Sequence, residues 1–177
     1  MIQSETMKHV EGMLGRATIV ANQFEDHVKS VTSLLKLRRN MSIMGTDAQI
    51  ADLYRSIHKK SLATCLKSWK CGAQDLYQVL CAAREARNTI VHEAPKRIRL
   101  AGLHEVEDQW PQLITDYFFF KTQIIVQGII VMCLYEIELR DTPVFIPPDD
   151  YENILPNWVI NRGPLEHEIK EIPEYDD

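Results

Sequence analysis

The chain has 177 residues, of which 45% are hydrophobic, and this size and composition fit one globular domain with its own core. Residues 1–140 hold 18 Lys and Arg against 15 Asp and Glu, whereas residues 141–177 hold 2 against 10. A mildly basic body with an acidic tail permits RNA contact at a local site. It excludes broad, sequence-independent DNA coating, which needs a large basic face.

Cysteine spacing and hydropathy indicate a reducing compartment and no membrane span. The four cysteines are Cys65, Cys71, Cys81 and Cys133. They show neither Cys-x2-Cys spacing nor a histidine at zinc-finger distance, so we interpret them as buried thiols. The N-terminal segment does not have the pattern of a signal peptide. The longest apolar stretch, residues 124–135, is shorter than the ~20 residues of a membrane helix. We therefore expect a cytoplasmic protein with no metal or other cofactor and no membrane contact.

Two helices are predicted in the first part of the chain. From Met7 onward, apolar residues recur three and four positions apart, which predicts a long first helix ending near Leu37. Residues 46–49 (Thr-Asp-Ala-Gln) fit a capping box, whose side chains satisfy the free N–H groups at a helix start. The pattern after this box predicts a second helix that continues to Gly72.

The third predicted helix, about residues 73–93, contains the most informative stretch. We expect Pro95 to end this helix, because proline has no N–H and disfavours helix at the residue before it. Arg87 falls within the apolar face, where a lone charge is costly unless it is paired. Glu25 or Asp26, near the middle of the first helix, could supply the partner across the core.

Polar residues of the same helix flank Arg87. Asn88 and His92, four residues apart, share a polar face with Arg84. Arg87 and His92 differ by five residues, about 140° around an ideal helix. Both can therefore face one phosphate only if the helix end distorts or a second chain contributes. The simpler interpretation is a buried ion pair for Arg87 and a solvated position for His92.

A basic turn and a fourth helix are expected after Pro95. The basic residues are Lys96, Arg97 and Arg99, which form either a solvated turn or a clamp for RNA phosphates. The fourth helix runs from Asp108 to about Arg140, with Pro111 just inside its start. It is apolar around much of its circumference, so it must be buried on most sides. In a bundle of about four helices, that composition predicts self-association.

These elements predict an all-α fold, an up-and-down bundle of about four long helices over residues 1–140. Residues 141–177 hold six of the eight prolines and no helical periodicity, which predicts an irregular, Pro-rich acidic tail. The apolar residues of this tail could dock on the bundle. Its acidic end could occupy a basic cleft or mark a site for a partner protein.

The stretch Arg87-Asn88-x-x-x-His92, late in a helix of a small all-α chain, resembles the Arg-x4–6-His motif of the HEPN superfamily (higher eukaryote and prokaryote nucleotide-binding domains). The resemblance covers roughly residues 15–140. It implies a metal-independent endoribonuclease of toxin or phage-defence type, in which Arg87 and His92 of two copies form one composite site at a homodimer interface. In that site, Asn88 and Arg84 would support the catalytic pair. The expected RNA-binding residues are Lys96, Arg97 and Arg99.

The implied chemistry needs no metal. A base takes the proton of the RNA 2′-OH as that oxygen attacks the adjacent phosphorus, and an acid protonates the leaving 5′-oxygen, which gives a 2′,3′-cyclic phosphate. His92 can serve in either proton role, and Arg87 stabilises the developing charge. Glu93 stands where the family favours a small residue. Ala94 stands where some toxins carry a tyrosine that a partner antitoxin modifies with AMP, so the resemblance does not extend to that acceptor.

Two alternatives remain open on the sequence alone. The first is a catalytically inactive HEPN-like domain that serves as a nucleotide-, RNA- or protein-binding module. The second is a structural helical dimer with a fortuitous motif. An antitoxin or other regulatory protein would be a partner under the ribonuclease reading.

Overall fold

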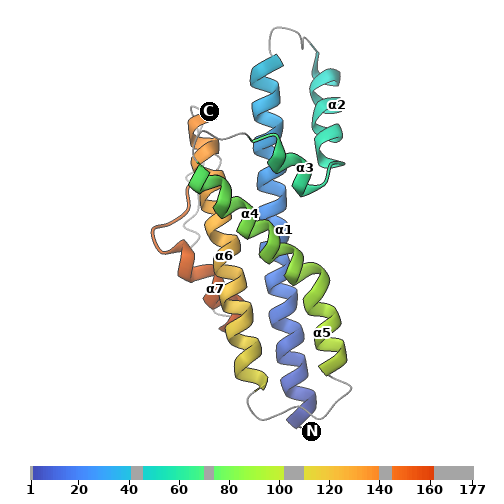
Figure 1. The fold of residues 1–177 in the computed structure, drawn as a ribbon, viewed down its shortest axis with the longest axis vertical. Coiled ribbons are helices and arrows are strands. Elements are labelled where there is room, and N and C mark those ends of the chain that lie inside the picture. The colour runs from blue at the N-terminus through green and yellow to red at the C-terminus, as the bar shows by residue number, and fades with distance from the viewer. Residues whose placement is uncertain (1, 41–45, 70–73, 102–109, 140–144, 162–177) are drawn as a thin grey trace, which may run out of the picture.

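The computed structural model describes residues 2–40, 46–69, 74–101, 110–139 and 145–161. The fold is all-α, as predicted (Figure 1). Its two longest helices, α1 (Ile2–Asn40) and α6 (Trp110–Leu139), pack side by side along the length of the molecule. They form the frame on which the shorter helices lie.

The motif helix crosses this frame and then continues beyond the point where we expected it to stop. Helix α4 (Gln74–Asn88) packs mainly on α6, and it leads without a break through η1 (Thr89–Glu93) into α5 (Ala94–Ala101). Figure 1 shows this segment running diagonally in α4 and then turning to follow α1 in α5. The prediction that Pro95 ends the helix is therefore wrong.

The predicted second helix is two helices, α2 (Asp47–His58) and α3 (Leu62–Lys67). The capping box at its start is confirmed, because the Thr46 side chain accepts from the Gln49 N–H while the Gln49 side chain accepts from the Thr46 N–H. The chain breaks after His58 because Ser61 starts α3 as an N-cap, with its hydroxyl accepting from the Thr64 N–H at 3.2 Å.

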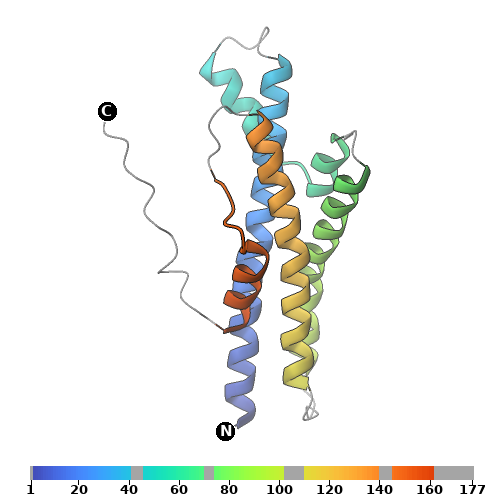
Figure 2. The ribbon, with the colours of Figure 1, turned by 90° about the vertical axis from the view of Figure 1, so that its left-hand side faces the viewer.

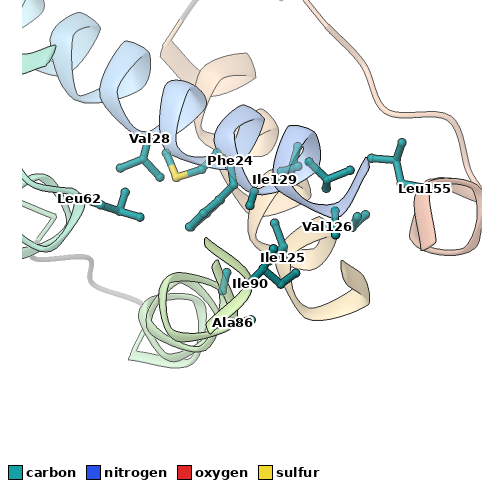
Figure 3. Close-up of a cluster of buried hydrophobic side chains, with 14 of the residues drawn as sticks. Phe24, Val28, Leu62, Ala86, Ile90, Ile125, Val126, Ile129 and Leu155 are labelled. Carbon is teal, nitrogen blue, oxygen red and sulfur yellow. The ribbon is translucent and has the colours of Figure 1, made fainter. Parts of the chain in front are cut away.

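A close crossing of α4 and α6 holds the motif helix in place. A Cβ added to Gly128 of α6 would lie 2.4 Å from the Ala83 Cβ and 2.8 Å from Phe24 Cε2, so only glycine fits here. Figure 3 shows Phe24 beside the side chains that α4, η1 and α6 contribute to the core. The labelled residues of those three elements are Ala86, Ile90, Ile125, Val126 and Ile129. The motif helix is thus anchored by shape as well as by apolar area.

Helix α6 supplies much of the core and also exposes apolar side chains. Its exposed large hydrophobic residues are Leu113, Phe120, Leu134 and Ile137. By length and composition alone, α6 could cross a membrane, with a mean hydropathy of 1.6 in its most apolar window, half of which is buried inside the protein. The central helix of a globular protein meets the same criterion. Self-association through the exposed face remains a prediction.

The segment expected to be an irregular tail contains a helix, α7 (Tyr151–Asn161). Tyr151, Leu155 and Val159 are buried, and α7 packs against α6 and α1 (Figure 2). Arg16 of α1 donates to the Val159 carbonyl at 2.8 Å. The expected docking of apolar tail residues is therefore confirmed, although Pro156 inside the helix concealed its helical character from the sequence pattern. Residues 162–177 lie outside the described part of the chain.

Candidate functional site

The candidate site is built on a π turn. In η1 the N–H of Ala94 bonds to the carbonyl of Thr89, five residues back instead of four. Pro95 explains the location of this turn, because proline cannot donate an N–H and its ring crowds the carbonyl four residues before it. A wider turn relieves that crowding and lets the helix continue. π turns are rare and are frequent at functional sites.

The π turn brings the two motif residues together within one chain. Arg87 Nη1 lies 3.3 Å from His92 Nε2. On a regular α-helix these side chains would point about 140° apart. Helix distortion was one of the two solutions that the five-residue spacing allowed, and it is the one the structure shows.

Arg87 is anchored from the opposite side by α1. Its Nη2 donates to Glu25 Oε2, and the Lys29 ammonium group lies 2.7 Å from Glu25 Oε1. The side chains of Arg87, Glu25 and Lys29 are only 15%, 18% and 12% exposed. The expected ion pair of Arg87 with Glu25 or Asp26 is therefore confirmed for Glu25. Lys29 was missed, although its position four residues after Glu25 on a helix is the usual spacing of an ion pair.

The charge of Glu25 is stabilised by its two partners. Burial acts to raise the pKa of this carboxyl group, but the hydrogen bond from Lys29 and the positive charges of Arg87 and Lys29 outweigh it. The pKa of Glu25 therefore lies below its ordinary value of 4.5. At neutral pH the carboxylate fixes one edge of the Arg87 guanidinium group and leaves Nη1 directed at His92.

The supporting residues behave differently from each other. Asn88 is exposed and accepts a hydrogen bond from Arg87 Nη1 at 3.1 Å, so it orients the arginine. Arg84 forms an ion pair with Glu85, with 3.7 Å between its Nη2 and Glu85 Oε1. Among the described residues, no hydrogen bond or ion pair joins Arg84 to the Arg87–His92 pair. Within the described chain, Nε of Arg84 and of Arg87 are buried without a hydrogen-bond partner.

The three expected RNA-binding cations lie on α5 and not in a turn. Lys96, Arg97 and Arg99 are exposed, and no ion pair holds them among the described residues. Arg97 also lines an apolar groove of about 140 Å³ between α5 and α6. Tyr117 of α6 lines the same groove, its hydroxyl is buried without a described partner, and burial raises its pKa.

The chemistry of the two side chains determines which atom donates in the contact between Arg87 and His92. A guanidinium group can only donate hydrogen bonds, so Arg87 Nη1 can bond His92 Nε2 only when that nitrogen carries no proton. His92 is exposed to solvent. When this hydrogen bond forms, Nε2 is its acceptor, and the exposed ring lies beside a cation that Glu25 holds in place.

No metal site is found among the described residues. These residues contain no group of three or more His, Cys, Asp or Glu side chains placed to hold a metal ion. Comparisons with family models, with curated proteins and with solved structures find no match to this chain. The protein is therefore all-α, and a π turn brings Arg87 and His92 together. The largely buried carboxylate of Glu25 holds Arg87 in place.

Proposed function

We propose that this chain is a metal-independent endoribonuclease of HEPN type, of the toxin or phage-defence class, with Arg87 and His92 as its catalytic residues. The observation that carries the proposal is the 3.3 Å approach of Arg87 Nη1 to His92 Nε2 across the π turn. RNA cleavage by its own 2′-OH requires a base for the 2′-OH proton, a positive charge at the phosphate and a proton for the leaving 5′-oxygen. His92 and Arg87 supply the first two, and solvent, to which His92 is exposed, supplies the third.

The geometry supports a simple sequence of events. A phosphate that enters the site competes for Arg87 Nη1, since a guanidinium group binds phosphate oxygens more strongly than a neutral nitrogen acceptor. This movement frees His92 Nε2 to take the proton of the attacking 2′-OH. The Glu25 contact keeps the other edge of the guanidinium group in place, so that Nη1 remains at the phosphorane oxygens as charge develops.

We also propose a homodimer in which two copies of this site share one cleft. The exposed apolar residues of α6 support this proposal, because a helix with an apolar outer face is costly to leave in water. Dimer mass measured by light scattering tests it directly. Mixing Arg87→Ala and His92→Ala proteins then distinguishes two arrangements: cleavage is restored if arginine and histidine act across the interface, and is not restored if they act within one chain.

The primary experiment is RNA cleavage with EDTA present throughout. We expect wild type to cleave and to leave cyclic-phosphate ends, and we expect His92→Ala and Arg87→Ala to lose cleavage while keeping their fold. His9→Ala removes an exposed histidine elsewhere on α1 and serves as the matched control, with full activity expected. Equal cleavage by all four proteins would refute the assignment.

The alternative function is an inactive HEPN-like module that binds nucleotide, RNA or protein. It is favoured by the ion pair itself, because Glu25 already neutralises the charge that catalysis would use. Absence of cleavage by wild type, together with RNA binding that weakens in Arg87→Ala, is the result that would select this function. An antitoxin or regulatory protein that covers the site is compatible with either function.

A further inference from the structure

The basic charge of the helical body is concentrated in one part of the chain. Residues 29–70 carry nine Lys and Arg against two Asp, a net charge of +7. Residues 1–28 carry two against four, and residues 71–140 carry seven against nine, so each of these parts is net −2. The nine cations are Lys29, Lys36, Arg38, Arg39, Arg55, Lys59, Lys60, Lys67 and Lys70. The whole positive excess of the body therefore lies between Lys29 and Lys70.

The eight of these cations that the structure describes lie on elements gathered at one end of the molecule. The C-terminal half of α1 lies there beside α2 and α3, as Figures 1 and 2 show. The break between α2 and α3 places Lys60 in the turn that faces α1. Lys29 reaches this turn as well, since its ammonium group donates to the His58 carbonyl at 3.1 Å.

Lys36 and Lys60 approach each other although both are positively charged. The Lys60 amine and partial burial together lower the pKa of Lys36. Neither lysine has an ion pair with a carboxylate among the described residues. Both side chains are half-buried. Their positive charges and that of Lys29 act to lower the pKa of the buried Cys65 thiol, although burial raises this pKa overall. Such a pair of like charges is unfavourable in the free protein and would be relieved by a bound anion.

The lysine pair is connected to the candidate catalytic site along α1. Lys29 shares the Glu25 carboxylate with Arg87. Lys36 lies seven residues beyond Lys29, which is two helical turns or about 10 Å along the axis. Lys29, Lys36 and Lys60 thus form a strip of lysines that begins beside Arg87. Its first member, Lys29, is largely buried and paired with Glu25, so Lys36 and Lys60 are the members left for an external anion.

We infer that Lys36 and Lys60 form a binding site for the phosphate backbone of single-stranded RNA, on the side of the molecule that leads away from Arg87 and His92 along α1. The inference rests on the proposed function for its substrate class, because RNA is the polyanion on which that site would act. Backbone contacts of this kind position the strand and do not read its sequence.

The test is salt-dependent binding of a 20-nucleotide uridine RNA by the His92→Ala protein, with and without the double change Lys36→Gln and Lys60→Gln. Loss of two phosphate contacts should reduce the slope of log Kd against log salt concentration by about 1.4, since each contact to a single strand contributes about 0.7. The matched control is Lys8→Gln with Lys121→Gln, two lysines outside the strip, and its slope should be unchanged. Equal slopes in all three proteins, or the same loss in the control, would overturn the inference.

A second readout separates binding from a structural role. Removing the two repelling charges in Lys36→Gln with Lys60→Gln should leave the melting temperature of the RNA-free protein unchanged or raised, while RNA binding falls. If the double variant is less stable, Lys36→Arg with Lys60→Arg decides: retained RNA binding in that charge-preserving protein supports the site, and lost binding refutes it. Inorganic triphosphate should bind with a much smaller salt slope than the RNA, because it can occupy only the lysine pair.

Failure of this RNA-binding inference can be distinguished from failure of the proposed ribonuclease function. RNA cleavage by wild type, together with an unaltered salt slope after Lys36→Gln and Lys60→Gln, refutes the binding site and leaves the ribonuclease assignment intact. Absence of cleavage with a reduced salt slope refutes the ribonuclease assignment and leaves the RNA-binding strip intact. Tight binding of an acidic peptide without RNA binding would instead identify this surface as a protein interface and refute the inference.

Discussion

Glu25 of α1 and Arg87 of α4 form an ion pair although 62 residues separate them in the chain. The pair joins the first helix to the motif helix at the point where the π turn begins. Lys29 binds the second oxygen of the same carboxylate. Glu25 therefore balances two cations and fixes the direction in which Arg87 presents its remaining N–H groups.

Replacing Glu25 by glutamine should weaken both the fold and the site. The shape is preserved, but Arg87 and Lys29 lose the charge between them, and removing one partner of a largely buried pair costs about 2 kcal/mol of unfolding free energy. We expect cleavage to fall about tenfold or more, because a loosely held arginine no longer stays at the phosphate. Urea unfolding and RNA cleavage measure the two effects.

The control for this change is Glu11→Gln, which alters an exposed carboxylate on the same helix and should leave both quantities unchanged. Unaltered stability in Glu25→Gln would show that the ion pair does not anchor Arg87.

Gly128 should tolerate no side chain. In Gly128→Ala the new methyl group meets Ala83 and Phe24, so α4 and α6 must move apart, and overpacking of this kind costs about 1–3 kcal/mol. Gly15→Ala is the matched change on an open helical surface, with nothing within 4 Å of the new atom. It should stabilise the protein by up to about 1 kcal/mol through helix propensity. Thermal unfolding of both variants gives opposite signs if the close crossing is correct.

His27 should make the protein less stable in mild acid. Burial lowers the pKa of His27, although Glu136 and Asp26 act to raise it, and its Nδ1 lies 3.7 Å from the Cys133 thiol. The unfolded chain binds a proton more readily than the folded one, so the contribution of neutral His27 to stability is lost as pH falls from about 6.5 through the folded pKa.

Melting temperatures between pH 7.5 and 5 measure this dependence. His27→Gln should flatten the curve over that interval, whereas His9→Gln, at an exposed position of α1, should keep its slope. A steeper curve in His27→Gln would contradict the assignment.

Two truncations should distinguish the contribution of α7 to stability from that of the acidic residues that follow it. A chain ending at Asn161 keeps Tyr151, Leu155 and Val159 buried and should unfold within about 1 °C of wild type. A chain ending at Asp150 loses these contacts and the Arg16 hydrogen bond, and its melting temperature should fall by about 5 °C or more. Higher RNA cleavage by the first truncation than by wild type would indicate that residues 162–177 cover the site.

The long helices were predictable because their patterns were long. The seam of α1 and the apolar length of α6 each repeat over many turns, and the capping box at Thr46 has a specific local chemistry. The boundary at Ser61 coincides with a change of phase in the apolar pattern, since Ile57 and Leu62 are five residues apart, about 140° around an ideal helix. This signal was present in the sequence, and the single predicted helix overlooked it. In α7, Pro156 argued against a helix in the sequence, because proline is unfavourable inside one. The helix nevertheless forms, with Tyr151, Leu155 and Val159 buried against the bundle.

The Arg87–Glu25 ion pair was predictable from the sequence, whereas the geometry that brings Arg87 to His92 was not. The position of Arg87 on an apolar face predicted a buried partner, and Glu25 was one of the two candidates. The π turn was not predictable, because the rule that proline ends a helix assumes regular α geometry up to that residue. Catalysis, RNA binding and dimer formation remain predictions.

The π turn also makes the number of residues between Arg87 and Pro95 critical. Side chains at exposed positions of η1 can change without moving the backbone, but one residue added or removed there would rotate everything downstream by about 100° relative to α4. Ile98 would then leave the core, and Arg97 would leave the groove beside Tyr117. In this segment, substitutions should be tolerated far more readily than insertions or deletions.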